Sequence, residues 1–113
     1  MRQLTHFQQL SAPRQALVRL CQRINFGRIE DMEIRRGEPV FNPAPQVFFD
    51  VRLDTEDAAR PEQELPDFAL PEEICRLMAR LDAIGDGTIE RIEVRAGIAR
   101  RLIFEAANPE VRR

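Results

Sequence analysis

The sequence contains no lysine, tryptophan or tyrosine, and it has only one histidine and two cysteines. With His6 alone, neither a zinc site built from cysteine and histidine nor a catalytic dyad that uses histidine is expected. All seventeen basic residues are therefore arginine, in a chain whose formal net charge is −2. Because a GC-rich genome produces the same bias, arginine usage alone does not indicate phosphate binding.

Long apolar runs are missing as well. No stretch approaches the roughly 20 apolar residues of a membrane span, and the segment MRQLTHFQQL lacks the apolar core of a secretory signal. Cys21 and Cys75 form no CxxC pair, so we predict two buried, reduced thiols. Together with the 113 residues and 43% apolar content, these features predict a single cytoplasmic domain, 1–113, with no membrane partner.

Two stretches of the chain, sixty residues apart, share one pattern. Gly27 to Gly37 reads GRIEDMEIRRG and Gly87 to Gly97 reads GTIERIEVRAG, with six of eleven positions identical. The segments at 17–24 and 74–81 also match, at an offset of fifty-seven. The sequence therefore predicts two units of a helix followed by a β-hairpin, at about 12–53 and about 70–106, joined by an acidic crossover at 54–69.

Each unit begins with a helical pattern of apolar residues. Ser11 is a predicted N-cap and Pro13 fits the first turn of the first helix, whereas the second helix is predicted to begin at Pro71. Apolar residues then recur at three- and four-residue spacing: Ala16, Leu17, Leu20, Cys21 and Ile24 in one helix, and Ile74, Leu77, Met78 and Leu81 in the other. A short helical arm is predicted at Leu4, Phe7 and Leu10.

After each helix the apolar period changes to two, which is typical of a half-buried strand. In both copies the first isoleucine is out of phase with the later apolar residues, which predicts a β-bulge near Glu30 and its equivalent. Gly37 and Gly97 are predicted to supply the positive φ of a hairpin turn. A further half-buried strand is predicted from Val47 to Leu53.

The predicted fold class is therefore α+β. Two helix-plus-hairpin repeats would form a four- to five-stranded antiparallel sheet with both helices on one face. Since each unit alone would expose its apolar helix stripe, we expect the copies to share one core around a pseudo-two-fold axis. The crossover from Asp54 to Asp67 carries six acids against Arg60 and is predicted to be a flexible connection or a lid.

The segment DAIGDGTIERIE, from Asp82 to Glu93, resembles the calcium-binding loop of the EF-hand family. Asp82, Asp86, Gly87, Ile89 and Glu93 match loop positions one, five, six, eight and twelve. Position three is Ile84, however, which offers no oxygen ligand. We therefore interpret the segment as a connection between helix and strand in which Asp82 or Asp86 accepts backbone hydrogen bonds, and we predict no metal and no cofactor.

A basic strip on the two hairpins is the candidate interaction surface. Its predicted members are Arg28, Arg35 and Arg36 in the first hairpin and Arg91, Arg95, Arg100 and Arg101 in the second. Glutamates interleave with them, and Glu33/Arg35 and Glu93/Arg95 are predicted to form exposed cross-strand ion pairs. No pair of carboxylates is marked by its spacing as an acid/base couple, so no catalytic residue is predicted.

The stretches INFGRIEDMEIRRGEPVF and IGDGTIERIEVRAG are similar to small bacterial proteins of unknown function with a helix and a glycine-terminated hairpin. That resemblance implies a fold and no activity. The sequence favours a non-enzymatic binding domain whose partner is another protein, or a second copy bound through an edge strand or the N-terminal arm. The alternatives are a nucleic-acid-binding module that uses the arginines, and a ligand-binding protein or small hydrolase with its site between the repeats.

Overall fold

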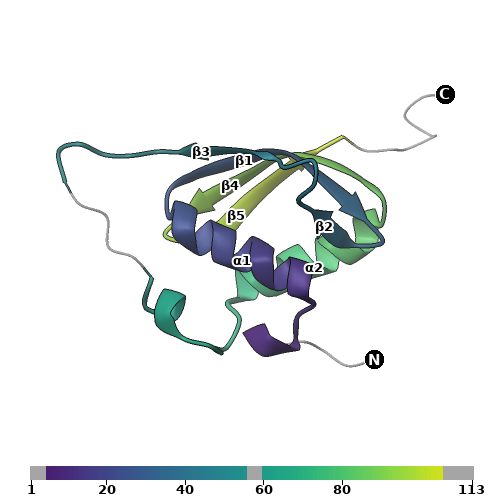
Figure 1. The fold of residues 1–113 in the computed structure, drawn as a ribbon, viewed down its shortest axis with the longest axis horizontal. Helices are drawn as coiled ribbons and strands as arrows, with labels where there is room; N and C mark the ends of the chain where they lie inside the picture. The colour runs from purple at the N-terminus through teal and green to yellow at the C-terminus, as the bar shows by residue number, and fades with distance from the viewer. Residues whose placement is uncertain (1–4, 56–59, 106–113) are drawn as a thin grey trace.

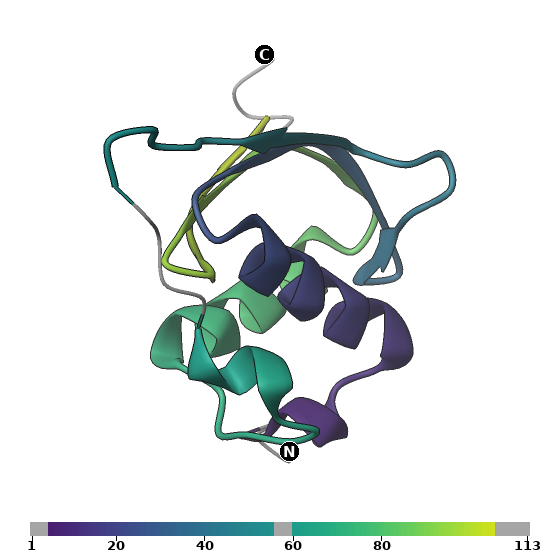
Figure 2. The same cartoon turned by 60° about the vertical axis from the view of Figure 1, so that its left-hand side comes forward.

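One arched antiparallel sheet is covered on one face by two helices (Figures 1 and 2). The structure is a computed structural model that describes residues 5–55 and 60–105. Its elements are η1 (Phe7–Gln9), α1 (Ala12–Ile24), β1 (Gly27–Arg35), β2 (Glu38–Val40), β3 (Gln46–Phe49), η2 (Pro61–Glu64), α2 (Glu72–Ile84), β4 (Gly87–Arg95) and β5 (Ile98–Phe104). The predicted α+β fold is confirmed, including the helix-then-hairpin arrangement that occurs twice. Neither helix of the described residues is long and apolar enough to cross a membrane.

The equivalent strands β1 and β4 lie side by side at the centre of the sheet. The strand order is β2-β1-β4-β5, and β3 also pairs with β1. Gly27 lies opposite Val94, and Ile34 lies opposite Gly87. Because Gly87 and Val94 are the repeat equivalents of Gly27 and Ile34, the pairing is unchanged when the two copies are exchanged. The central strands thus follow the expected pseudo-two-fold relation.

The predicted phase slip is present in both central strands. Asp31 has a φ of 59°, and the apolar residues on either side of it, Ile29 and Met32, are both fully buried. In the second copy the β4–β5 register shifts between Ile89 and Arg91. One extra residue in each strand therefore returns all its apolar side chains to the helix-covered face.

Both hairpins turn through two residues of positive φ. The values are 52° and 76° for Arg36 and Gly37, and 53° and 77° for Ala96 and Gly97. This combination defines a type I′ turn, whose twist matches that of the flanking strands. The predicted role of the two glycines is confirmed, and each is preceded by a residue with a Cβ in the left-handed region.

Each hairpin turn is tied to the helix of the other copy. The Gly37 N–H donates to the Gly85 carbonyl at the end of α2 over 2.8 Å. Symmetrically, the Gly97 N–H donates to the Asn25 carbonyl at the end of α1 over 2.9 Å. The two copies are therefore interlocked, since each satisfies a backbone group of its partner copy.

The core lies between the sheet and the helices. Fully buried side chains from both copies fill it, among them Leu17, Ile29, Leu81 and Ile92. Cys21 is also fully buried, and the loss of hydration raises the pKa of its thiol to about 12. Cys75 is only half-buried, so the prediction that both cysteines are buried holds for Cys21 alone.

The N-terminal segment is packed against the body and is not an exposed arm. Phe7 and Leu10 are buried, and the Phe7 ring stacks on that of Phe68 at 4.9 Å between centroids. Only the 3₁₀ turn η1 forms there, and Leu4 lies outside the described residues. Because the apolar side chains of the turn are already covered, Phe7 and Leu10 cannot serve the predicted self-association.

The strand predicted from Val47 to Leu53 ends early, at Phe49. Phe49 lies opposite Gly27, the first residue of β1, and the Asp50 N–H still donates to the Phe26 carbonyl over 2.7 Å. Beyond Asp50, no strand of the described residues pairs with the segment. Val51 is 66% exposed and Leu53 is 95% exposed. The prediction of a half-buried strand is therefore wrong for the last part of that segment, which runs past the end of the sheet (Figure 1).

The described second half of the crossover is docked on α1. The Arg19 guanidinium donates to the carbonyls of Glu62 and Leu65 and lies 4.2 Å from the centroid of the Phe7 ring. Arg60 is hydrogen-bonded to Glu62 over 2.6 Å, which lowers the pKa of that carboxyl. Residues 60–69 are thus held in place, whereas 56–59 lie outside the described residues.

Candidate functional site

The two aspartates of the calcium-loop resemblance have structural partners. Asp82 accepts a hydrogen bond of 2.5 Å from Arg14, whose buried guanidinium also donates to the Gly37 carbonyl. Asp86 accepts from the Arg36 N–H at 2.9 Å. Both carboxylates therefore fix the hairpin turn of the other copy. Within residues 5–55 and 60–105, no group of three or more His, Cys, Asp or Glu side chains is placed to hold a metal ion.

The seven arginines of the predicted basic strip occupy three separate places. Arg28, Arg91 and Arg95 line one shallow hollow on the sheet face away from the helices, and Arg101 is linked to it through Glu93. Arg35 and Arg36 lie at the first hairpin turn. Arg100 lies on the helix side, beside α2. The structure therefore gathers four of the seven and leaves three elsewhere.

Glutamates neutralise much of the outer face. Glu30 lies 2.7 Å from the Arg28 guanidinium and 3.6 Å from that of Arg91. Glu93 lies 3.7 Å from Arg91 and 4.0 Å from Arg101, so its partners are not the predicted Arg95. Cross-strand ion pairs do form between Glu30 and Arg91 and between Glu93 and Arg101, whereas Glu33 pairs with Arg35 within β1. Such exposed pairs contribute little to stability, but they reduce the net positive potential.

The candidate binding site is a groove between α2 and β5. Two adjoining hollows of about 320 Å³ and about 270 Å³ share Arg80 and Phe104. The first extends from Glu73 along α2 and the second reaches Asp86, so the groove follows nearly the whole helix. Neither hollow was predicted from the sequence as a site.

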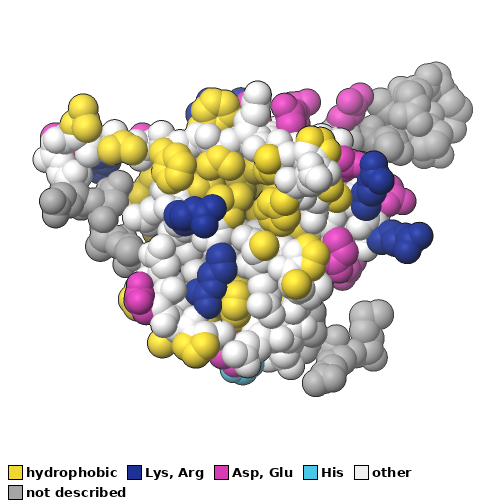
Figure 3. All heavy atoms as spheres, viewed as in Figure 1, with side chains coloured by type: hydrophobic (Ala, Val, Ile, Leu, Met, Phe, Trp, Pro, Cys, Tyr) yellow, Lys and Arg dark blue, Asp and Glu magenta, His cyan; other side chains and the backbone are white. Residues whose placement is uncertain are grey.

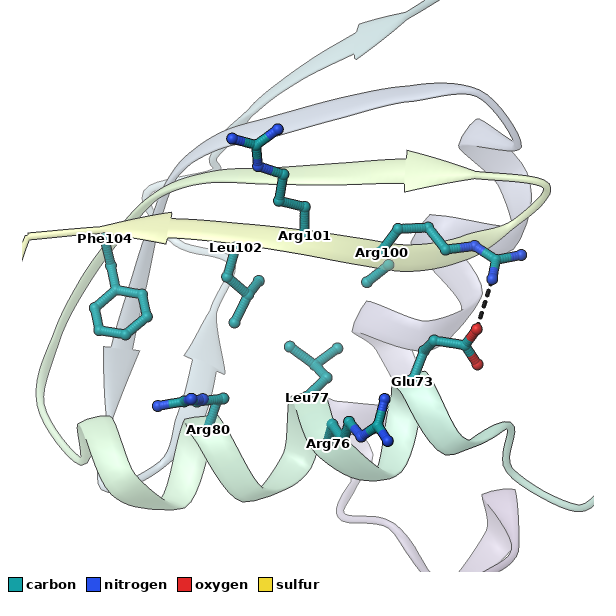
Figure 4. A pocket seen from close by; sticks show the side chains of 9 residues that line it. Glu73, Arg76, Leu77, Arg80, Arg100, Arg101, Leu102 and Phe104 are labelled. Carbon is teal, nitrogen blue, oxygen red and sulfur yellow. Dashed lines mark hydrogen bonds and ion pairs between the residues drawn. The ribbon is translucent and has the colours of Figure 1, made fainter.

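The floor of the groove is apolar and its walls carry arginines (Figure 4). Leu77 of α2 and Leu102 of β5 point toward each other, and Phe104 extends from β5 toward the helix. Arg76 and Arg80 project from α2 along one wall. The groove can therefore cover apolar side chains and offer cations at its rim.

A bulge in β5 places Arg100 at this groove. Glu93 pairs with Arg101, whereas the next residue, Val94, pairs with Ala99, which leaves Arg100 as the extra residue. Its side chain reaches α2, where a guanidinium nitrogen lies 2.6 Å from a Glu73 oxygen (Figure 4). Arg101 points away from α2 in the same view. The two consecutive arginines therefore serve opposite faces of one strand.

The outer edge of β5 is available for pairing. Within the described part of the chain, β5 pairs only with β4 and ends the strand order. It is seven residues long and contains no proline. An unpaired edge of this length presents a row of backbone donors and acceptors, and here that row lies directly above the apolar groove.

Equivalent helix positions have different surroundings in the two copies. Arg19 of α1 corresponds to Arg76 of α2 at the offset of fifty-seven residues. Arg19 binds backbone carbonyls of the chain's own residues 62–65. Arg76 is exposed and pairs only with Glu72, one turn away on the same helix, among the described residues. The second copy thus leaves open a position that a polypeptide segment fills in the first.

Hydrophobic side chains also gather at the opposite edge of the sheet. They form a band between β3 and α1, and the segment that follows β3 carries more of them (Figure 3). Phe41 and Val47 are partly buried against the core, whereas Phe49, Val51 and Leu53 are exposed. An apolar surface therefore continues from the sheet onto the segment that overhangs it.

The sequence did carry a signal for the α2–β5 groove. Arg76 and Arg80 are spaced by four residues, so they share one side of the helix beside Leu77. A strand of alternating character follows β4 with no proline to interrupt it. Recognising the groove would have required knowing that this strand is the last of the sheet.

Comparisons of the chain with protein-family models, with curated proteins and with solved structures find no match. The resemblance to small bacterial helix-plus-hairpin proteins thus stays a prediction. The function proposed below is argued from the groove and the strand edge.

Proposed function

We propose that this chain is a non-enzymatic protein-interaction domain that binds an extended peptide segment along β5 and α2. The observation that carries the proposal is the unpaired seven-residue edge of β5 above an apolar floor. Adding a strand to such an edge gives affinity through backbone hydrogen bonds and specificity through alternate side chains. Leu77, Leu102 and Phe104 would receive the apolar side chains of the bound strand.

The first copy supports a polypeptide as the occupant. There, Arg19 already binds three carbonyl groups of the chain's own segment 62–65. The equivalent Arg76 faces the groove and is exposed. A bound peptide would offer Arg76 the same chemistry, whereas a small anion would leave the backbone edge of β5 unused.

The charges of the groove favour acidic residues at one end of the peptide. Arg76 and Arg100 lie with Glu73 at the end where β5 begins, and Arg80 lies between the two hollows. The other end carries Asp86 and Glu105. Complementary charges therefore orient the ligand: a strand antiparallel to β5 would place its acidic residues toward its own C-terminal end.

The outer face supports nucleic-acid binding less well. Its arginines alternate with Glu30 and Glu93, which lie within 4.0 Å of three of them. A phosphate-binding surface gains affinity by releasing counterions, and arginines that already pair with glutamate release few. The alternative is tested in the same assay with labelled DNA, where steeply salt-dependent binding that is lost in Arg28→Ala would favour it.

The test is fluorescence polarisation with labelled seven-residue peptides, a length that matches β5. One peptide alternates valine with threonine and ends in two aspartates (the valine–aspartate peptide), a second ends in two lysines instead, and a third keeps the two aspartates but has threonine in place of each valine. We expect the valine–aspartate peptide to bind at least about ten-fold more tightly than either of the others, since only it satisfies both floor and rim.

Arg80→Glu is the diagnostic variant, and Arg23→Glu is its matched control. The two positions correspond at the offset of fifty-seven residues, and both side chains are exposed. Arg80→Glu should weaken the valine–aspartate peptide about ten-fold, and Arg23→Glu should leave its affinity unchanged. Equal effects of the two substitutions, or equal binding of all three peptides, would refute the proposed groove.

A further inference from the structure

The chain carries a segment with the properties that the groove selects. Residues 49–55 read FDVRLDT, and the apolar residues Phe49, Val51 and Leu53 alternate with polar ones. Their exposed fractions rise along the segment, from 56% to 66% to 95%. Alternation with a period of two is the pattern of a strand that has one apolar face. Here most of that face is exposed among the described residues.

The cause of this exposure lies in the architecture of the first copy. β3 pairs with β1 only as far as Gly27, so the residues after Phe49 extend beyond the sheet (Figure 1). Leaving Leu53 in water is unfavourable, and a strand without a neighbour also leaves its backbone groups to solvent. An edge that could cover both exists on the same molecule, at β5.

We infer that the occupant of the α2–β5 groove is the segment 49–55 of a second copy of this chain. The inference rests on the proposed function, because it assigns a partner to the same groove. Val51 and Leu53 of one copy lie on the apolar floor of the other, and the segment extends the sheet of that copy by one strand. The interaction is therefore self-association by strand addition.

Charge and side-chain alternation select one orientation and one register. Antiparallel pairing that places Val51 opposite Phe104 and Leu53 opposite Leu102 directs both apolar side chains into the groove. The same register places Asp54 opposite Arg101 on the outer face. A shift by one residue would turn Val51 and Leu53 to the opposite face.

The first test is sedimentation velocity of the full chain over a range of concentrations. We expect concentration-dependent self-association that Leu53→Asp weakens at least ten-fold. Because the Leu53 side chain is almost fully exposed, the substitution leaves the core of the protomer intact. Leu65→Asp is the matched control, since Leu65 is a second exposed leucine outside the segment, and its self-association should equal that of the unaltered chain.

A charge-reversal experiment tests the register. Asp54→Arg and Arg101→Asp should each weaken self-association of the separate proteins. Mixing the two variants should restore a complex of one copy of each, because the reversed segment then meets the reversed groove. A mixture that associates no better than either variant alone would overturn this register.

The outcomes separate this inference from the proposed function. Binding of the valine–aspartate peptide by a chain that stays monomeric at every concentration would overturn the inference and leave the groove as a peptide site. Self-association that is insensitive to Leu53→Asp would also overturn it. If a chain that ends at residue 105 binds the peptide ten-fold more tightly than the full chain, residues 106–113 are the occupant, and the inference fails. Failure of every peptide to bind would remove the proposed function itself.

Discussion

Raising the pH is expected to destabilise this fold through one buried thiol, that of Cys21. The folded protein holds the Cys21 proton up to about pH 12 because the side chain is buried among apolar groups. An unfolded chain loses the same proton at about pH 8.5. Below that pH both states bind the proton, so the Cys21 thiol does not reduce the free energy of unfolding. Above it the unfolded state binds fewer protons, so the free energy of unfolding falls as the pH rises.

The expected loss is about 1.4 kcal/mol for each pH unit above about 8.5. At about pH 10.5 the protein should therefore have lost about 3 kcal/mol, a large share of the 5 to 15 kcal/mol typical of a domain. Lysine and tyrosine, which ordinarily titrate in this range, do not occur in the chain. The decrease in the free energy of unfolding at alkaline pH should thus arise from cysteine ionisation, with little contribution from other side chains.

Urea denaturation, followed by far-ultraviolet circular dichroism at about pH 8 and at about pH 10.5, measures this loss. Cys21→Ala should be less stable at the lower pH by about 1 to 2 kcal/mol, because it removes a buried atom, but its stability should vary far less with pH. Cys75→Ala should keep the pH dependence of the unaltered chain. If Cys21→Ala and the unaltered chain lose stability equally, ionisation of Cys21 is not the cause and the reasoning is wrong.

Three further predictions concern the backbone and the polar link between the copies. Gly27→Ala should lower the free energy of unfolding by about 2 to 4 kcal/mol, because its Cβ would lie 2.0 Å from the Phe48 carbonyl oxygen and force β3 away from β1. The equivalent Gly87→Ala has room for the Cβ and should raise the free energy of unfolding by up to about 1 kcal/mol. Equal shifts in the thermal midpoint of the two variants would contradict the geometry. Ala96→Gly should stabilise by about 1 kcal/mol in urea denaturation, since it removes a Cβ from a left-handed turn position; no change would refute this. Arg14→Leu should cost about 1 to 3 kcal/mol in the same assay, because the Gly37 carbonyl loses the donor of a buried hydrogen bond; a loss under about 0.5 kcal/mol would show that water replaces it.

Much of the fold follows from local signals in the sequence. Ser11 accepts a hydrogen bond from the Arg14 N–H at the start of α1, as expected of an N-cap. Gly37 and Gly97 adopt the positive φ that their turns require. Each of these features is decided by residues within a few positions along the chain, so a single sequence is enough to predict them.

The features that define the candidate site depend on contacts distant in sequence. β3 ends at Phe49 because β1 begins at Gly27, which the alternation of residues 47–53 does not reveal. Arg100 reaches α2 because the register between β4 and β5 shifts beside it. Which strand becomes the sheet edge is likewise a property of the whole topology. The arginine strip was therefore predicted as one surface, whereas the structure divides it among the outer face, the first hairpin turn and the α2–β5 groove.

The differences between the copies account for both sides of the inferred contact. The return strand of the second hairpin is the continuous β5, whereas that of the first is divided into β2 and β3 by the stretch from Phe41 to Pro45. β3 reaches the start of β1 at Phe49, so the residues after it run past the sheet and leave Leu53 exposed. β5 has no such interruption and keeps a full edge beside its groove. The return strand of the first copy thus continues past the start of its partner strand and forms the overhanging segment, whereas β5 ends opposite Ile89 of β4 and keeps the edge that can receive it.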